Sequence, residues 1–320
     1  FSSRRRHTRS STVSVGSEMC IRDRGKMDIS VVNIEENAGQ VPVNYVLPPG
    51  VTRIIDPGQS QITQLNEQAM SLKVTDLQSG DARAVYKNSG MDMRTYKRLQ
   101  MFVHAEKLID DKTNLRDGDV SVFLRLGSDS KSNYYEYEVP LSLTEPGNYS
   151  TYNAQDQEAV WPQSNMFDFP LSLFTDLKLE RNAKKRMDNS TVTFQTRYSS
   201  YDPDKNQNKV TIVGNPSLSD VRTMMIGVRN NSNAAKDIVV WVNEMRLTDF
   251  DQSGGWAAKA NVNLGLSDIA TLNIAGHVET VGFGGIDQSL TERRLDDYYQ
   301  YNIATVSYTH LRAHETVLDL

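Results

Sequence analysis

Oxygen-bearing side chains occupy every second position from Asp202 to Asn208, first two carboxylates and then two amides. This spacing resembles the ligands at the start of a calcium-binding loop. Such a loop also needs glycine at its sixth position and a bidentate glutamate at its twelfth. Those two positions hold Gln207 and Val213 in this sequence. We therefore predict a solvated loop here and no metal site.

Two other places hold residue types that general acid–base catalysis uses. Glu136 and Glu138 fall two apart on an expected strand, about 7 Å from each other, a spacing that suits the carboxylate pair of a glycosidase. Glutamates so spaced are also ordinary solvated residues of an exposed strand face. His104 has no serine or cysteine motif beside it to activate, so we predict an exposed or hydrogen-bonded histidine. We expect no enzyme activity and no cofactor.

Tyrosine is the one surface residue type that is enriched in the middle of the chain. Carbohydrate-binding modules stack sugars on rigid aromatic side chains at the edges of a β-sandwich, although aromatic residues are also common inside sheets. We expect an exposed aromatic surface made of Tyr134, Tyr135, Tyr137 and Trp161. A secreted carbohydrate-binding β-sandwich module is therefore the alternative function that these residues leave open.

Strands dominate the expected secondary structure from residue 68 onward, because apolar and polar residues alternate with a period of two. The expected strands include residues 99–105, 120–126, 135–143, 210–213, 223–228 and 237–247, and the one expected helix spans residues 171–181. Many short strands separated by turn signals indicate two packed sheets. We predict an all-β chain with a jelly-roll-like β-sandwich at residues 59–250, preceded by an extended or strand-like connector at residues 27–58.

Residues 251–305 show a different pattern, in which two runs of about nine residues alternate without interruption around a turn. This length suits strands that cross a membrane at a tilt. Trp256 and the tyrosines of residues 298–301 fall where interfacial aromatic side chains would lie. A soluble hairpin packed on a core gives the same alternation. We predict transmembrane strands of an outer-membrane β-barrel, with lipid-facing positions at Trp256, Ala258, Ala260, Val262, Leu264, Leu272, Ile274 and Val278.

The composition of the chain excludes several classes of protein. The 320 residues are 38% hydrophobic and 23% charged, which is unlike a disordered chain. The longest apolar run, residues 238–242, is far shorter than the roughly 18 residues of a spanning helix. A formal net charge of −5 argues against non-specific nucleic-acid binding. Cys20 is the single cysteine, which rules out an internal disulfide.

Both ends of the chain differ in character from its interior. Residues 1–26 gather basic and small polar residues, without the apolar stretch after Arg4 that a signal peptide would need. These residues and residues 306–320 resemble the conceptual translation of sequencing-adapter DNA, so we expect two non-native segments around an internal fragment. Between them the chain carries 27 basic and 36 acidic residues, a net charge of −9.

Several strings between residues 27 and 305 occur in an order that is typical of one protein family. They are YVLPPGVTRIIDP, QLNEQAMSLKV, GDARAVYKN, MDMRTYKRLQMFVHAEKL, DGDVSVFLRLGSDSKSNYYEYEVPL, VWVNEMRLTDFD and LTERRLDDYYQYNIAT. Together they resemble successive blocks of the SprA family, called Sov in some lineages. The members of this family are the outer-membrane translocons of type IX secretion in the Bacteroidota and are required for gliding motility.

The resemblance implies a single-chain barrel of many strands in the outer membrane, at the cell surface. The partners that it implies are outer-membrane lipid, secreted cargo proteins with C-terminal signal domains, a PorV-like partner barrel and plug proteins, and no nucleic acid. It offers no catalytic, cofactor-binding or metal-binding residues to carry over. We therefore expect a fragment of a protein-conducting pore that exports cell-surface proteins.

Overall fold

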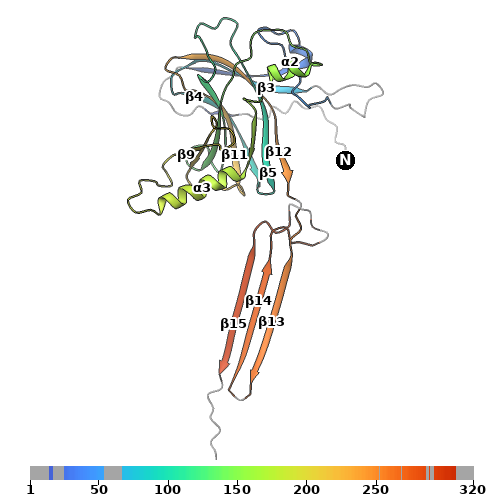
Figure 1. Ribbon diagram of the computed structural model, residues 1–320, viewed down its shortest axis with the longest axis vertical. Coiled ribbons are helices and arrows are strands. Elements are labelled where there is room, and N and C mark those ends of the chain that lie inside the picture. Colours follow the sequence, from blue (N-terminus) through green and yellow to red (C-terminus); the bar gives the residue numbers. More distant parts are fainter. Residues whose placement is uncertain are drawn as a thin grey trace, which may run out of the picture. The chain divides into compact units, whose positions relative to one another are not determined.

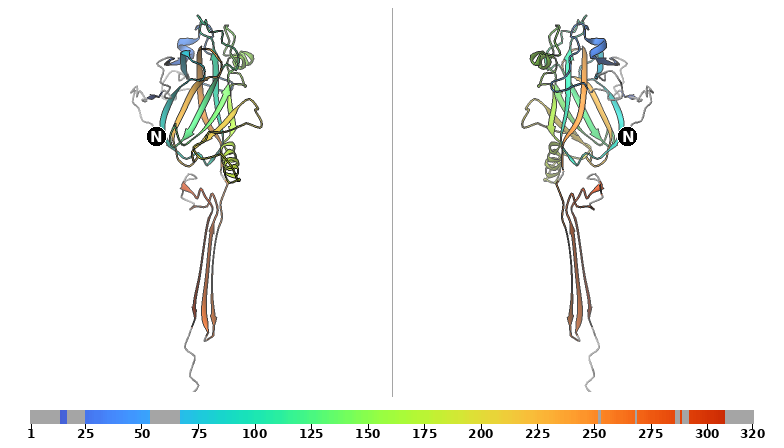
Figure 2. Two further views of the ribbon diagram at one scale, coloured as in Figure 1. Left: turned by 90° about the vertical axis from the view of Figure 1, so that its left-hand side faces the viewer. Right: turned by 90° about the vertical axis from the view of Figure 1, so that its right-hand side faces the viewer.

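The computed structural model describes residues 14–16, 25–53, 67–251, 253–267, 269–285, 288 and 292–307 (Figures 1 and 2). Strands are the dominant regular structure of these residues and helices are few, which confirms the predicted all-β class. The strands form three sheets, and none of the three closes into a barrel within the described residues. Contacts within the chain divide it into two compact units, Phe1–Asp249 and Phe250–Leu320.

Most of the two terminal segments expected to be non-native lies outside the described residues, and so does Cys20. The described parts of these segments are β1 (Ser14–Gly16), residues 25–26 and residues 306–307. The expected connector is described up to residue 53, and it contains β2 (Lys26–Asn33) and the short helix α1 (Ile34–Asn37).

One sheet of the first unit has seven strands in the order β1-β4-β11-β6-β7-β10-β9, with antiparallel pairing throughout. Besides β1 it contains β4 (Ala82–Met91), β6 (Val120–Gly127), β7 (Tyr134–Pro140), β9 (Tyr198–Tyr201), β10 (Lys209–Val213) and β11 (Val221–Asn230). Because β7 lies between β6 and β10, both of its edges are hydrogen-bonded. Residues 134–139 of this strand are all buried, so both of its faces are covered as well.

The other sheet of this unit has five strands in the order β2-β3-β12-β5-β8. Besides β2 it contains β3 (Gln68–Leu77), β5 (Tyr96–Glu106), β8 (Phe167–Pro170) and β12 (Lys236–Phe250). Both β12 here and β11 in the seven-stranded sheet are interior strands. Their position suits their nearly continuous apolar runs, because an interior strand of a covered sheet meets apolar surroundings on both faces.

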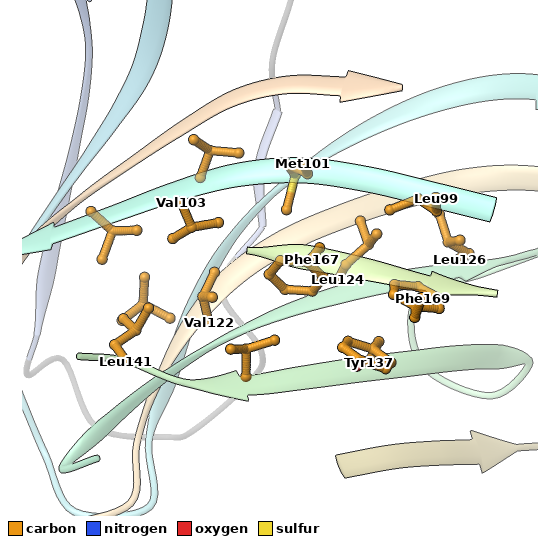
Figure 3. Close-up of a cluster of buried hydrophobic side chains, with 14 of the residues drawn as sticks. Leu99, Met101, Val103, Val122, Leu124, Leu126, Tyr137, Leu141, Phe167 and Phe169 are labelled. Carbon is orange, nitrogen blue, oxygen red and sulfur yellow. The ribbon is translucent and has the colours of Figure 1, made fainter. Parts of the chain in front are cut away.

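The hydrophobic core lies between the two sheets, where alternate residues of each strand face inward. Figure 3 shows the inward rows of β5 and β6, which are Leu99, Met101, Val103, Val122, Leu124 and Leu126. Since β5 belongs to the five-stranded sheet and β6 to the seven-stranded sheet, this contact joins them into a β-sandwich. Phe167 and Phe169 of β8 pack in the same layer against Tyr137.

The helix expected at residues 171–181 is present as α3 (Ser172–Lys185). Its buried residues Phe174, Leu177 and Arg181 fall three and four apart on one helix face. A second helix, α2 (Ala154–Val160), was not predicted, because seven residues with one buried side chain show no helical period. Within the described part of the chain, no helix has the length and apolar character needed to cross a membrane.

The second unit contains one antiparallel sheet of β13 (Ala257–Leu266), β14 (Ala270–Glu279) and β15 (Tyr298–Ser307), with β14 in the middle. Figures 1 and 2 show these strands running side by side along their whole length. The pairing is regular, with all ten residues of each strand in register. Within the described residues, β13 and β15 are hydrogen-bonded on one side only, so this sheet is open at both edges.

Candidate functional site

The sheet of β13, β14 and β15 separates apolar from polar side chains by its register. Residues directly opposite each other in an antiparallel ladder share a face, and Val262, Ile274 and Ile303 form one such row. The apolar face consists of Ala258, Ala260, Val262, Leu264, Leu266, Ala270, Leu272, Ile274, Gly276, Val278, Tyr299, Tyr301, Ile303, Thr305 and Ser307. The register therefore brings the seven expected lipid-facing positions of β13 and β14 onto this one face.

Large side chains on the apolar face are open to solvent. The exposed fraction is 46% for Val262, 45% for Leu264 and 65% for Ile303. A hairpin packed on a soluble core, which the sequence left open, would bury these residues. An exposed apolar patch that runs across three strands instead marks contact with a membrane or with another protein.

Aromatic side chains gather at one end of the apolar face. Trp256 extends this face by one row, because its backbone N–H donates to Thr280 Oγ1 at 2.8 Å and its carbonyl accepts from the Thr280 N–H at 2.9 Å. Tyr299 and Tyr301 lie on the same face in the next rows. All three aromatic side chains are more than half exposed. Amphipathic rings in such a position are typical of a boundary between lipid and water.

The opposite face of the sheet is polar. Lys259 lies opposite His277 in the ladder, and asparagine, threonine or glutamine occupies six further positions, which are Asn261, Asn263, Thr271, Asn273, Gln300 and Asn302. Glu279 lies at one end of this face, with the His277 Nε2 atom 3.2 Å from its Oε1 and the Arg294 Nε atom 2.9 Å from its Oε2. Tyr298 also lies on this face, with its ring 5.8 Å from that of His277. Of the expected interfacial tyrosines, Tyr298 is therefore separated from the other two.

The strand β15 adds Tyr299, Tyr301, Ile303 and Thr305 to the apolar face, whereas the sequence analysis assigned no lipid-facing position to this strand. The signal for it was the alternation of Tyr301 and Ile303 with amide side chains. This signal is weak, because Ala304 and Val306 of the same strand place apolar residues on the opposite face.

The expected exposed aromatic surface is wrong, because Tyr134, Tyr135, Tyr137 and Trp161 are all buried and none is more than 5% exposed. For the three tyrosines the cause is the interior position of β7, which the alternation of its residues did not reveal. The Tyr137 ring stacks on Phe169 with centroids 3.9 Å apart, and the Tyr137 hydroxyl donates to Asp202 Oδ2 at 2.6 Å.

Two of the other three aromatic residues of the expected surface are covered in different ways. The Arg125 guanidinium lies over the Tyr134 ring, 4.3 Å from its centroid. The Trp161 indole N–H donates to the carbonyl of Val46 at 2.8 Å. None of the four rings presents a face on which a sugar could stack, so the carbohydrate-binding alternative loses the surface that suggested it.

Glu136 and Glu138 are also buried, and they do not form a solvated pair. The Arg125 Nε lies 2.5 Å from Glu136 Oε2, and the Arg229 Nη1 lies 3.1 Å from Glu136 Oε1. Arg197 pairs with Glu136 as well, and Arg229 also pairs with Glu138. Burial alone would raise the pKa of Glu136, but the three guanidinium groups hold this pKa below its ordinary value.

The remaining residues with possible chemistry are used in internal hydrogen bonds. His104 is fully buried, and its Nδ1 lies 2.8 Å from the carbonyl oxygen of Val160, which is the hydrogen-bonded placement that the sequence allowed. Asp202 accepts from the backbone N–H of Asp204 at 2.9 Å as well as from Tyr137. Within the described residues, no cluster of three or more histidine, cysteine, aspartate or glutamate side chains could hold a metal ion.

Comparison with known families gives this arrangement a context. The sequence model of the SprA_N family, described as a motility related/secretion protein, matches residues 12–314. The chain belongs to this family. Its membership confirms the resemblance that the ordered strings of the sequence carry. No curated protein matches the chain.

Membership of the SprA family connects the chain with motility and secretion. The exposed apolar face and the polar face of β13, β14 and β15 offer surfaces for unlike surroundings. This sheet is therefore the candidate functional site of the second unit.

Proposed function

We propose that this chain forms part of a protein-conducting outer-membrane translocon, needed for export of cell-surface proteins and for gliding motility. In this proposal, β13, β14 and β15 are strands of a membrane-spanning β-barrel wall. Their apolar face meets outer-membrane lipid, and their polar face meets the aqueous interior. The observation that carries the proposal is the exposed apolar face that continues in register across all three strands.

Strand length supports a membrane crossing. Each strand has ten residues, which corresponds to about 33 Å of extended chain. At a tilt of about 40°, such a strand spans about 25 Å, the height of the apolar band of outer-membrane barrels. The aromatic side chains at one end of the apolar face would then lie at the lipid–water boundary.

The open edges of this sheet support its place in a larger wall. Unpaired backbone N–H and C=O groups are too costly to expose to hydrocarbon, so sheets cross membranes only when they are closed. In the proposal, further strands pair with β13 and with β15 to complete the barrel. The sandwich of the first unit, for which we propose a jelly-roll-like arrangement, is a water-exposed domain of the same protein.

The family relationship suggests the partners of such a translocon. We propose that its cargo consists of secreted proteins with C-terminal signal domains, and that a PorV-like barrel and plug proteins act beside it. The basis for these partners is the SprA family membership, together with the secretion and motility description of that family.

A charge scan of β13 tests the membrane role in cells that express the protein. Val262 lies near the middle of β13 on the apolar face, and Asn261 lies beside it on the polar face. Val262→Arg should destabilise the membrane-inserted state by about 2–4 kcal/mol. It should therefore lower the amount of protein in the outer membrane, the export of surface proteins and the spreading of colonies.

The matched control is Asn261→Arg, which adds the same charge to the face that meets water in the proposal. This variant should retain export and spreading. Equal loss with both variants, or no loss with either, would contradict the assignment of lipid to the apolar face.

A further inference from the structure

A cavity of about 390 Å³ opens beside the seven-stranded sheet of the first unit. Its wall includes Ser121 of β6, Glu138 of β7 and Arg229 of β11. These residues lie on the sheet face that points away from the sandwich core, because the neighbouring Val122 and Tyr137 point into the core. The cavity is therefore separate from the hydrophobic interior.

Cations outnumber carboxylates around this cavity. Among the described residues, its lining includes three cations, Arg197, Lys209 and Arg229, and one carboxylate, Glu138. The buried pair of Arg125 and Glu136 behind this wall adds no net charge. The lining therefore carries two surplus positive charges, in a chain whose overall formal charge is −5. A local surplus of this kind attracts an anion even on an acidic protein.

The cationic groups are held in place by their own contacts. Arg229 donates from Nη1 and Nη2 to Glu136 at 3.1 and 3.2 Å, and its guanidinium lies 4.6 Å from the centroid of the Phe123 ring. Arg197 is anchored to Glu136 through Nη2, while 43% of its side chain remains exposed. An anchored guanidinium loses little conformational entropy when a ligand binds, which favours affinity.

Polar groups that are already fixed complete the cavity. The Asn231 amide donates to Ser121 Oγ at 3.0 Å, and Ser121 Oγ donates to Glu138 Oε1 at 2.5 Å. Glu138 thus accepts hydrogen bonds from Ser121 and from Arg229. Because these hydrogen bonds already occupy Glu138, an incoming anion meets the cations of the wall.

We propose that this cavity binds a carboxylate ligand with up to two negative charges. Planar guanidinium groups bind carboxylates through paired hydrogen bonds, and two negative charges match the two surplus positive charges of the wall. The carboxylates can belong to a small dicarboxylic acid or to acidic side chains of a peptide. This proposal goes beyond the membrane role and does not depend on it.

Titration calorimetry on the full chain in a non-ionic detergent tests the site. The probes are succinate and the blocked peptide acetyl-Glu-Gly-Glu-amide, each at constant ionic strength. Saturable binding of at least one probe is expected. Binding of succinate identifies a small acid as a sufficient ligand, whereas binding of the peptide alone identifies an acidic segment.

Substitutions in the cavity wall test whether the probes bind in this cavity. Arg197→Gln should weaken the affinity about tenfold, because it removes a charge-assisted contact, and Lys209→Gln should weaken it as well without touching Glu136. The control Arg222→Gln removes the same charge from an exposed residue that pairs with Asp220 and should leave the affinity unchanged. The proposal is overturned if neither probe shows saturable binding, or if Arg222→Gln weakens binding as much as Lys209→Gln.

Discussion

The sequence favours a solvated surface position for Glu136, whereas the structure buries this residue. Its side chain is fully buried among three guanidinium groups, which belong to Arg125, Arg197 and Arg229. Each arginine comes from a different segment of the chain, so no local spacing in the sequence indicates that these residues form a cluster around Glu136. Two glutamates in alternation give the same pattern whether water or arginine covers their strand face.

Removal of the Glu136 charge should destabilise the sandwich strongly. Glu136→Gln keeps the shape of the side chain but leaves buried guanidinium charge uncompensated, at a cost of about 3 kcal/mol. Urea unfolding followed by the emission of the buried Trp161 and Trp241 measures this change. The control Glu158→Gln, at an exposed position of α2, should leave the unfolding midpoint nearly unchanged. A Glu136→Gln midpoint equal to that of the control would contradict the role of this network.

The same carboxylate makes stability depend on pH. The arginines depress the pKa of Glu136 in the folded state below its ordinary value of 4.5. A group with a depressed folded pKa contributes stability above its unfolded pKa and loses it as the pH falls through the folded value. The difference in unfolding free energy between wild type and Glu136→Gln should therefore be largest near neutral pH. It should shrink as the pH falls below 4.5, and a constant difference would refute this assignment.

At the scale of elements, the sequence predicts the helices and strands whose apolar residues repeat with one clear period. The helix at 171–181 and the strands of the core follow from their apolar spacing, and so do the faces of β13 and β14. The environment of β7 did not follow, because alternation identifies a strand but does not reveal what covers each face. The partners of β7 and the register that adds β15 to the apolar face depend on contacts between distant segments.

The inward row of β6 should carry much of the stability of the sandwich. Leu124 is fully buried where β6 faces β5 (Figure 3). Leu124→Ala should lower the unfolding free energy by about 2–5 kcal/mol, because it removes apolar contacts and leaves a cavity. Ile109→Ala, at a side chain that is 66% exposed, is the matched control and should change little. Chemical denaturation of both variants gives the comparison, and similar losses would contradict the position of Leu124 in the core.

At the scale of the whole molecule, the two units differ in whether their apolar side chains are buried or exposed. The first unit encloses them between two sheets. The second unit displays them on one face of three strands. A protein with both kinds of surface suits a place where water and lipid meet, and the SprA family membership connects the chain with secretion and motility.

The most direct test of the membrane role is a lipid-quenching scan along β13 in membranes from cells that express the protein. Single cysteines replace residues 261, 262, 263 and 264 in a Cys20→Ser background, and each carries a fluorophore that nitroxide-labelled lipid quenches. We predict strong quenching at positions 262 and 264 and weak quenching at positions 261 and 263. Quenching that does not alternate, or that is absent at all four positions, would contradict a lipid-facing apolar face.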